Sequence, residues 1–170
     1  MNSLSASALI LALATGCSTT SASAEATTPD ALRGTIDKLY SAFSFEPGQP
    51  ADYAAMRSLF APGAAFVSPG AGRAVDAEGF LEDFRNWLEG PVGATGLRER
   101  VLHVRSQHLG NIAHAWITFE GVLPETGERH SLGVDSVQFL NHEGAWRLVS
   151  FTTHYVADEN ELPATRLSGD

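Results

Sequence analysis

The sequence predicts an α+β domain in which helices come first and a curved antiparallel sheet follows. Three stretches with apolar residues at helical spacing, residues 30–43, 52–60 and 76–88, occupy the first half of the chain. Four β-rich runs, each of roughly ten residues, fill the second half and are long for strands. Only short turn segments separate these runs, and neighbouring strands with short links pair antiparallel. Helices followed by strands favour the α+β class over alternating βαβ units.

Composition narrows the classes of partner. The 170 residues suit one domain, and a hydrophobic share of 44% is enough for one sizeable core. The net charge of −9 gives no positive field that would attract a phosphate backbone, so we expect no nucleic-acid partner. A single cysteine excludes an internal disulfide framework and a cysteine-rich zinc module. No apolar run is long enough for a permanent transmembrane helix.

Residues 1–24 are interpreted as a signal peptide, because they contain no charged side chain and include the short apolar run Ala8–Ala14. Two processing sites follow this run. Cys17 ends a stretch that resembles a bacterial lipobox, whereas residues 22–24 form an A-x-A site for ordinary signal peptidase. Either route predicts an exported protein, periplasmic or anchored to the cell envelope by a lipid on Cys17. The alternative is a disordered tail rich in alanine and serine.

The predicted helices have clear start and stop signals. Thr28 is expected to cap the first helix, with Pro29 in its first turn. Asp76 is expected to cap the third helix, and a Gly-Pro pair at residues 90–91 to close it. Between the second and third helices, residues 64–68 form a short strand candidate.

The long strands are expected at residues 97–109, 112–123, 131–141 and 145–155. We therefore place the folded domain at residues 28–157 and a polar tail at residues 158–170.

Apolar side chains occupy both alternating faces of the predicted strands. In residues 112–119, His114 and Trp116 share one face, while Ala115 and Ile117 share the other. A sheet with one solvated face would alternate more cleanly. This pattern predicts helices over one face and partial cover over the other, for which a second copy of the chain, in a homodimer, is one candidate.

Local strings across residues 30–157 resemble the nuclear transport factor 2-like superfamily. They follow one another in the family's order, with a first helix, a short strand after the second helix, two middle strands and a last strand. The strings are LYSAF at 39–43, LFAPGAAF at 59–66, GNIAHAW at 110–116, GVDSVQF at 133–139 and GAWRLVS at 144–150. The resemblance implies a cone-shaped α+β barrel, in which three helices close a curved sheet around a pocket. Members of the superfamily include ketosteroid isomerases, dehydratases, polyketide cyclases and non-catalytic binding proteins, so the fold alone does not determine the function.

The resemblance also implies roles for single residues. Tyr40 and Asp135 fall where the steroid isomerases keep a tyrosine and a protonated aspartate that donate hydrogen bonds to the developing oxyanion. The catalytic base falls on Ser68, and a serine hydroxyl cannot take a proton from carbon near neutral pH without a base of its own. The isomerase reaction is therefore not expected. Tyr40 also fits a buried core tyrosine, and Asp135 a structural acid.

His114 is a candidate replacement for the missing base, because the pKa of histidine lies near neutrality. Paired with Asp135 on the neighbouring strand, it would resemble the dyads of dehydratases in this superfamily. A neutral histidine bonded to backbone or water is the alternative. By family similarity Trp116, Phe151 and Tyr155 would line the cavity, where aromatic walls suit a hydrophobic ligand. No local spacing of metal ligands or cofactor motif occurs, so we expect neither a metal nor a cofactor.

Three functions fit these features. The leading hypothesis is an exported or lipid-anchored binding domain that holds a small hydrophobic molecule through Tyr40, Ser68, His114 and Asp135. The second is an isomerase- or dehydratase-type enzyme with His114 as base, and Asp135 and Tyr40 orienting it or stabilising charge. The third is a protein-interaction module that works through the second face of the sheet.

Overall fold

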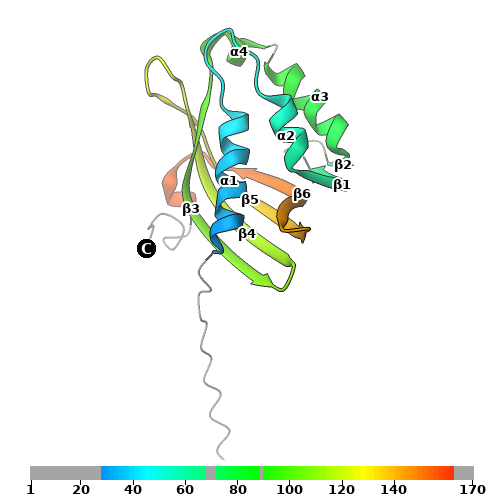
Figure 1. The fold of residues 1–170 in the computed structure, drawn as a ribbon. Helices are drawn as coiled ribbons and strands as arrows, with labels where there is room; N and C mark the ends of the chain where they lie inside the picture. Colours follow the sequence, from blue (N-terminus) through cyan, green and yellow to red (C-terminus); the bar gives the residue numbers. More distant parts are fainter. Residues whose placement is uncertain (1–27, 68–71, 89, 163–170) are drawn as a thin grey trace, which may run out of the picture.

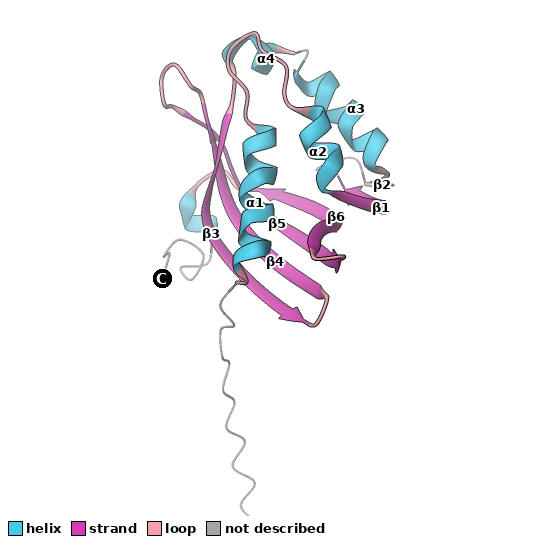
Figure 2. Cartoon of the chain, in the orientation of Figure 1, coloured by secondary structure: helices cyan, strands magenta, loops and turns pink. Residues whose placement is uncertain are grey.

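A six-stranded sheet, curved and open at both edges, forms the centre of the protein, and the long helices lie on one side of it (Figures 1 and 2). The computed structural model describes residues 28–67, 72–88 and 90–162. The predicted α+β class is confirmed. The strand order is β2-β1-β6-β5-β4-β3, so β2 and β3 are the two edges.

The first two helices follow the predicted ranges closely. Helix α1 spans Asp30–Phe43 and α2 spans Tyr53–Leu59, which Asp52 caps by accepting a hydrogen bond from the amide of Ala55 at 2.9 Å. The expected cap of α1 is wrong. Pro29 occupies the cap position and offers no side-chain acceptor, while the hydroxyl of Thr28 lies 2.6 Å from that of Ser106 on β3.

Helix α3 spans Ala77–Leu88, and the predicted cap is confirmed, because Asp76 accepts a hydrogen bond from the amide of Gly79 at 2.9 Å. A short helix that the sequence analysis did not anticipate, α4 at Pro91–Thr95, follows at once. It begins at the Gly-Pro pair that we expected only to end α3. A proline in the first turn of a helix loses no hydrogen bond, which is why the same pair both stops one helix and starts the next.

Four long strands form an antiparallel meander close to the predicted ranges. They are β3 at Arg98–Leu109, β4 at Ile112–Val122, β5 at Arg129–His142 and β6 at Ala145–Tyr155. Register shifts at Leu102 of β3 and at Val149 of β6, opposite Gln138 and Phe139, mark bulges, which bend a sheet and increase its twist.

The remaining two strands come from the helical half of the chain. Strand β1 spans Phe60–Val67, and its short partner β2 spans Ala74–Val75. Strand β1 runs parallel to β6, with Phe66 beside Phe151, so the first strand of the chain pairs with the last. Sequence reasoning anticipated a short strand near residues 64–68 but not its parallel partner.

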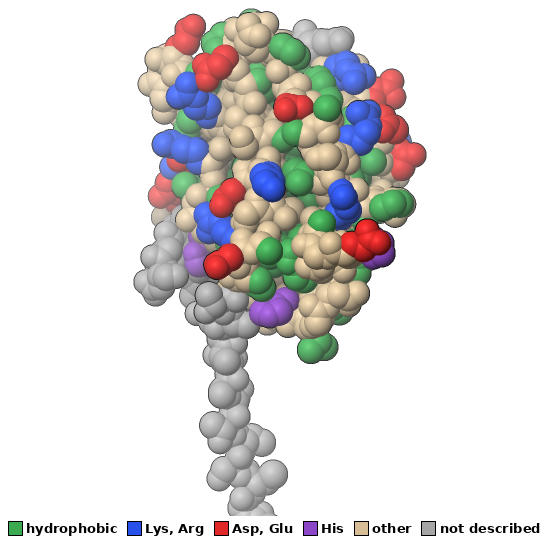
Figure 3. Space-filling model, in the orientation of Figure 1, with side chains coloured by type: hydrophobic (Ala, Val, Ile, Leu, Met, Phe, Trp, Pro, Cys, Tyr) green, Lys and Arg blue, Asp and Glu red, His purple; other side chains and the backbone are tan. Residues whose placement is uncertain are grey.

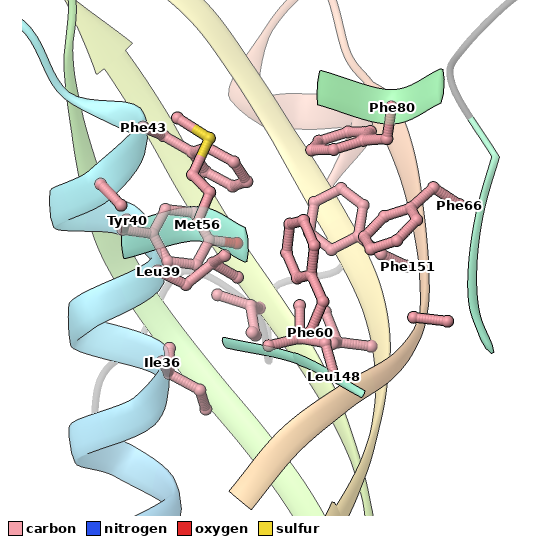
Figure 4. Packing of buried hydrophobic residues seen from close by; sticks show 14 of the residues in the cluster. Ile36, Leu39, Tyr40, Phe43, Met56, Phe60, Phe66, Phe80, Leu148 and Phe151 are labelled. Carbon is pink, nitrogen blue, oxygen red and sulfur yellow. The ribbon is translucent and has the colours of Figure 1, made fainter. Parts of the chain in front are cut away.

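The core fills the space between the helices and the concave face of the sheet (Figure 4). Aromatic rings make up much of it, and Phe66 stacks on Phe80 with centroids 4.6 Å apart and planes 22° apart. Fully burying a large apolar side chain contributes roughly 1.5–3 kcal/mol. These rings therefore anchor α3 to β1 and fix the helix that forms one wall of the site.

The opposite, convex face is partly covered by the chain that follows β6. Residues 158–162 turn through a short 3-10 helix, η1 at Glu159–Glu161, and Leu162 beyond it is buried. Arg129 on β5 holds this turn through an ion pair with Glu159 at 2.6 Å. The polar tail expected for residues 158–170 thus begins with a packed turn, and its remainder, 163–170, lies outside the described residues.

Acidic and basic side chains are mixed over the face that carries α1 and α2 (Figure 3). None of the helices in the described ranges combines the length and apolarity needed to cross a bilayer.

Candidate functional site

A cavity of about 290 Å³ lies between α1, α3 and the concave face of the sheet. Most of its wall is aromatic, and its polar lining consists of Asp83, Glu99, Asp135, Thr153 and Tyr155. The apolar wall is formed by Phe43, Val67, Phe80, Phe84, Trp87, Phe119 and Phe151. Apolar walls with a few convergent polar groups are typical of sites for small molecules, and this volume is at the lower end of their range.

Asp135 is the most buried polar group of the cavity, with 1% of its surface exposed. It lies in β5 on the same face as Val137 and Phe139, since alternate residues of a strand share a face. The hydroxyl of Tyr40, which reaches the sheet from α1, donates a hydrogen bond to Asp135 Oδ2 at 2.5 Å. Oδ1 has no hydrogen-bond partner among the described residues. A buried polar atom without a partner is costly, so this oxygen is a natural anchor for a ligand.

Burial strongly perturbs the acids of this cluster. Loss of water raises the pKa of Asp135 to about 7, and the hydrogen bond from Tyr40, together with the nearby hydroxyl of Thr153, only partly offsets that rise. Burial and the neighbouring charge of Asp135 raise the pKa of Tyr40 well above its ordinary range. Near neutral pH, Asp135 can therefore either accept a hydrogen bond as a carboxylate or donate one as an acid.

Glu99, near the start of β3, is a member of the site that sequence reasoning missed. It faces Gly121 of β4 and shares the concave side of the sheet with Val101. Burial, followed by the charge of Asp135, raises the pKa of Glu99 well above its usual value, so the two carboxyls sense each other inside the cavity. The available signal was its alternation with Val101, which gives both residues the same inward face.

Tyr155 lies at the mouth of the cavity, where half of its surface is exposed. Burial of the other half and the charges of Glu99 and Asp135 raise its pKa to about 12. Tyr155 and Phe151, two of the three aromatic residues expected to line the cavity, therefore form part of the wall. Ser68 lies outside the described residues, as does Cys17; Val67, which precedes Ser68, lines the cavity.

The expected pair of His114 and Asp135 does not form. In the β4–β5 ladder His114 lies opposite Gln138, whereas Asp135 lies opposite Ile117. Residues directly opposite in a ladder point to the same side, so His114 points to the convex face and Asp135 to the concave face. The His114 ring instead lies 3.1 Å from the hydroxyl of Ser136.

Trp116 follows His114 onto the convex face, and their rings meet edge to face at 5.2 Å. Its expected place in the cavity wall is therefore wrong. The reason is visible in the strand itself. The face that holds Ala115 and Ile117 is uniformly apolar and takes the core side, which leaves the mixed face of His114 and Trp116 outside.

Within the described ranges, no three histidine, cysteine, aspartate or glutamate side chains are arranged to hold a metal ion. The chemistry that the cavity offers is that of its carboxyl and phenol groups.

The curved open sheet, with helices over its concave face and a pocket between them, defines a domain of the cone-shaped type. Residues 33–155 match the family model of the SnoaL-like domain, and the chain belongs to that family, within the nuclear transport factor 2-like superfamily. The resemblance stated from the sequence is thus confirmed. No curated protein matches the chain.

Solved structures share the fold at low sequence identity. A protein of unknown function with a cystatin-like fold from Nostoc punctiforme has 16% identity and a TM-score of 0.63, covering 78% of this chain and 93% of its own. An NTF2-like protein with a cystatin-like fold from Novosphingobium aromaticivorans has 13% identity and a TM-score of 0.60, with coverages of 80% and 84%. An NTF2-like protein of unknown function from Pseudomonas putida KT2440 has 9% identity and a TM-score of 0.61, with coverages of 82% and 94%. At these identities the likeness extends to the fold alone.

Proposed function

We propose that the domain binds a small, mainly apolar molecule in the cavity and holds its polar group at Asp135. The observation that carries this proposal is the unpartnered Oδ1 of Asp135, buried at the wall of an aromatic cavity of about 290 Å³. An apolar ligand gains free energy from contact with the rings, and one polar group placed at Oδ1 removes the cost of an unsatisfied buried oxygen.

The fold around the cavity supports this proposal. Tyr40 binds one carboxyl oxygen from α1, which holds the Asp135 carboxyl in one orientation at the cavity wall. Phe43, Phe80 and Phe151 pack against one another with centroid separations near 6 Å, at 6.1, 6.1 and 5.9 Å. A rigid aromatic wall loses little side-chain entropy when a ligand binds, which favours affinity.

A thermal-shift screen tests the proposal with steroids, aromatic polyketides, quinones and small aromatic amines and alcohols. A ligand at a hundred times its Kd stabilises the folded state by about 2.7 kcal/mol, which raises the Tm of a domain of this size by about 10 °C. Absence of any shift across the panel counts against the proposal.

A matched pair of variants locates the binding. Thr153 lines the cavity, and Thr152, its neighbour in β6, is exposed on the other face of the sheet. Thr153→Phe is expected to fill the cavity and abolish the shift, whereas Thr152→Phe is expected to leave the shift unchanged. Equal shifts in the two variants would place the ligand elsewhere.

An enzyme of the isomerase or dehydratase type is the second candidate, favoured by the pKa of Asp135 near 7. A carboxyl with such a pKa exchanges protons readily at neutral pH, and Glu99 supplies a second acid within the cavity. His114 has no part in this version. Any carbonyl ligand from the screen is incubated in D2O and followed by NMR. Catalysed exchange at the carbon next to the carbonyl, lost in Asp135→Asn, is the expected result, and exchange that survives in Asp135→Asn contradicts it.

The N-terminal segment carries a separate proposal of export, supported by the uncharged residues 1–24 and their apolar run. Mass spectrometry of the protein purified from its native cells identifies the mature N-terminus. A lipid on Cys17 or a start at Glu25 supports export, and an intact residue 1 contradicts it.

A further inference from the structure

The charges that line the cavity share one sign. Asp83 on α3, Glu99 on β3 and Asp135 on β5 contribute three carboxyl groups. None of the described residues that line the cavity is lysine, arginine or histidine. His130 is not part of the wall but lies beside Trp87, with the two ring centroids 6.2 Å apart. A carboxylate or phosphate ligand would thus meet acidic side chains without a counter-ion.

The remaining wall suits a cation attached to an apolar group. Aromatic faces attract ammonium groups through the ring quadrupole, and Phe119 of the wall lies beside Tyr40, the residue bonded to Asp135, with ring centroids 5.8 Å apart. The body of the ligand would contact the phenylalanine rings. Its charged end would reach Oδ1 of Asp135, which is buried and has no partner in the described part of the chain.

We propose that the molecule held in this cavity is a protonated amine carried on a small apolar, ring-containing group. The proposal rests on the proposed binding function and names its ligand class. An ammonium N–H donates to Asp135 Oδ1 while Tyr40 continues to donate to Oδ2. Asp83 adds negative charge to the cavity wall, and an ammonium group favours the ionised form of Glu99, whose pKa burial raises, so an amine is preferred over an uncharged analogue of equal size.

Proton release accompanies binding. The acids that face the amine are Asp83 from α3, Glu99 from β3 and Asp135 from β5, and the phenols are Tyr40 from α1 and Tyr155 from β6. Burial keeps Asp135 about half protonated at pH 7, and an arriving ammonium favours the ionised form. If the ionised form alone accepts the amine, the apparent affinity rises about tenfold from pH 6 to pH 8. Alkylammonium groups, like that of lysine, stay protonated over this range.

The test uses three probes built on one phenyl ring, and titration calorimetry on the whole chain. We expect 2-phenylethylamine to bind with the highest affinity, 2-phenylethanol to bind at least tenfold more weakly, and phenylacetate not to bind measurably. Hydrogen bonds between charged groups are stronger than those between neutral groups. At pH 7 the heat of amine binding is expected to differ between phosphate and Tris buffers, which reports released protons, and the heat of alcohol binding is expected not to.

Glu99→Gln keeps the shape of the side chain and removes one carboxyl. This variant is expected to bind the amine severalfold more weakly and the alcohol with unchanged affinity. Glu125→Gln, on the exposed β4–β5 loop, is expected to change neither affinity. Equal affinity for amine and alcohol, or amine binding without proton release in wild type, overturns the proposal and leaves a hydrophobic pocket intact. The amine proposal is also overturned if none of the three probes binds. If, in addition, no compound of the thermal-shift panel raises the Tm, the proposed binding function itself is contradicted.

Discussion

Replacing Asp135 with asparagine gives the sharpest prediction, because it removes one buried acid and keeps its shape. Asparagine still accepts the hydrogen bond from Tyr40 and has no carboxyl proton to lose. In the wild type, the pKa of Asp135 rises from an ordinary 3.8 to about 7 in the folded protein. Between these two values the folded chain holds a proton that the unfolded chain has released. The stability that this proton provides is complete below about pH 4 and is lost as the pH rises through about 7.

The magnitude follows from the size of the shift. The pKa difference is roughly 3 units, and each unit corresponds to 1.36 kcal/mol, so wild type should lose about 4 kcal/mol relative to Asp135→Asn between pH 4 and pH 9. Glu99 acts in the same direction. Asp135→Asn removes a charge that helps to raise the pKa of Glu99. The stability of the variant should therefore depend on pH even less than the loss of Asp135 alone predicts.

Urea denaturation at several pH values measures the difference directly, because the free energy of unfolding is obtained at each pH from the same linear extrapolation. The wild-type curve should fall with pH more steeply than that of Asp135→Asn. Glu125→Gln, an exposed acid outside the cavity, should run parallel to wild type. Parallel curves for wild type and Asp135→Asn would refute the reasoning, because they would mean that Asp135 ionises in the folded state as it does in water.

Three further changes test other parts of the structure. Tyr40→Phe removes the donor to the buried Asp135 carboxyl, so urea denaturation should show the free energy of unfolding reduced by about 1–3 kcal/mol. The loss should grow from pH 5 to pH 8, because the carboxyl ionises over this range and a carboxylate accepts the stronger hydrogen bond. Unchanged stability at pH 8 contradicts this. Phe66→Ala opens a cavity in the aromatic core and should lower the free energy of unfolding by about 3–5 kcal/mol in the same assay. Leu109→Ala, at a side chain that is 79% exposed, should leave this free energy almost unchanged. Similar losses in the two variants would contradict the packing argument. The homodimer expected from the sequence would cover the exposed Leu109 and Ile112 on the convex face, so light scattering should give twice the monomer mass for wild type and one monomer mass for Ile112→Asp; a monomeric wild type contradicts it.

Local sequence patterns predict most of the secondary structure because they reflect local physics. The β-rich runs and short turns place β3 to β6 within a few residues of their observed bounds. Asp76 caps its helix as expected, since capping needs only a carboxylate and an amide three residues later. Thr28 fails as a cap because a distant partner, Ser106, binds its hydroxyl. Such a contact between residues far apart in the chain has no local signature.

The site could be predicted only in part, and the errors have one origin. His114 and Trp116 share one strand face, as expected, but that face is turned away from the cavity. The opposite face, which holds Ile117 and its neighbours, is the more apolar set and takes the core side. Glu99 was overlooked since it stands between Arg98 and Arg100, where a run of charges suggests a solvated strand. Its inward direction follows from strand alternation, which carries more weight here than the charge of its neighbours.

The pairing of β1 with β6 ties the order of synthesis to the order of folding. Phe60 and Phe66 leave the ribosome early, yet the strand with which they pair, β6, is the last in the chain. Closing so long a loop costs chain entropy before any contact repays it, and topologies rich in such distant pairs fold slowly. A nascent chain that ends before residue 145 would therefore lack β6, the strand with which β1 pairs. The protein should acquire its pocket in one late, cooperative step, and its two halves should not survive as separate modules.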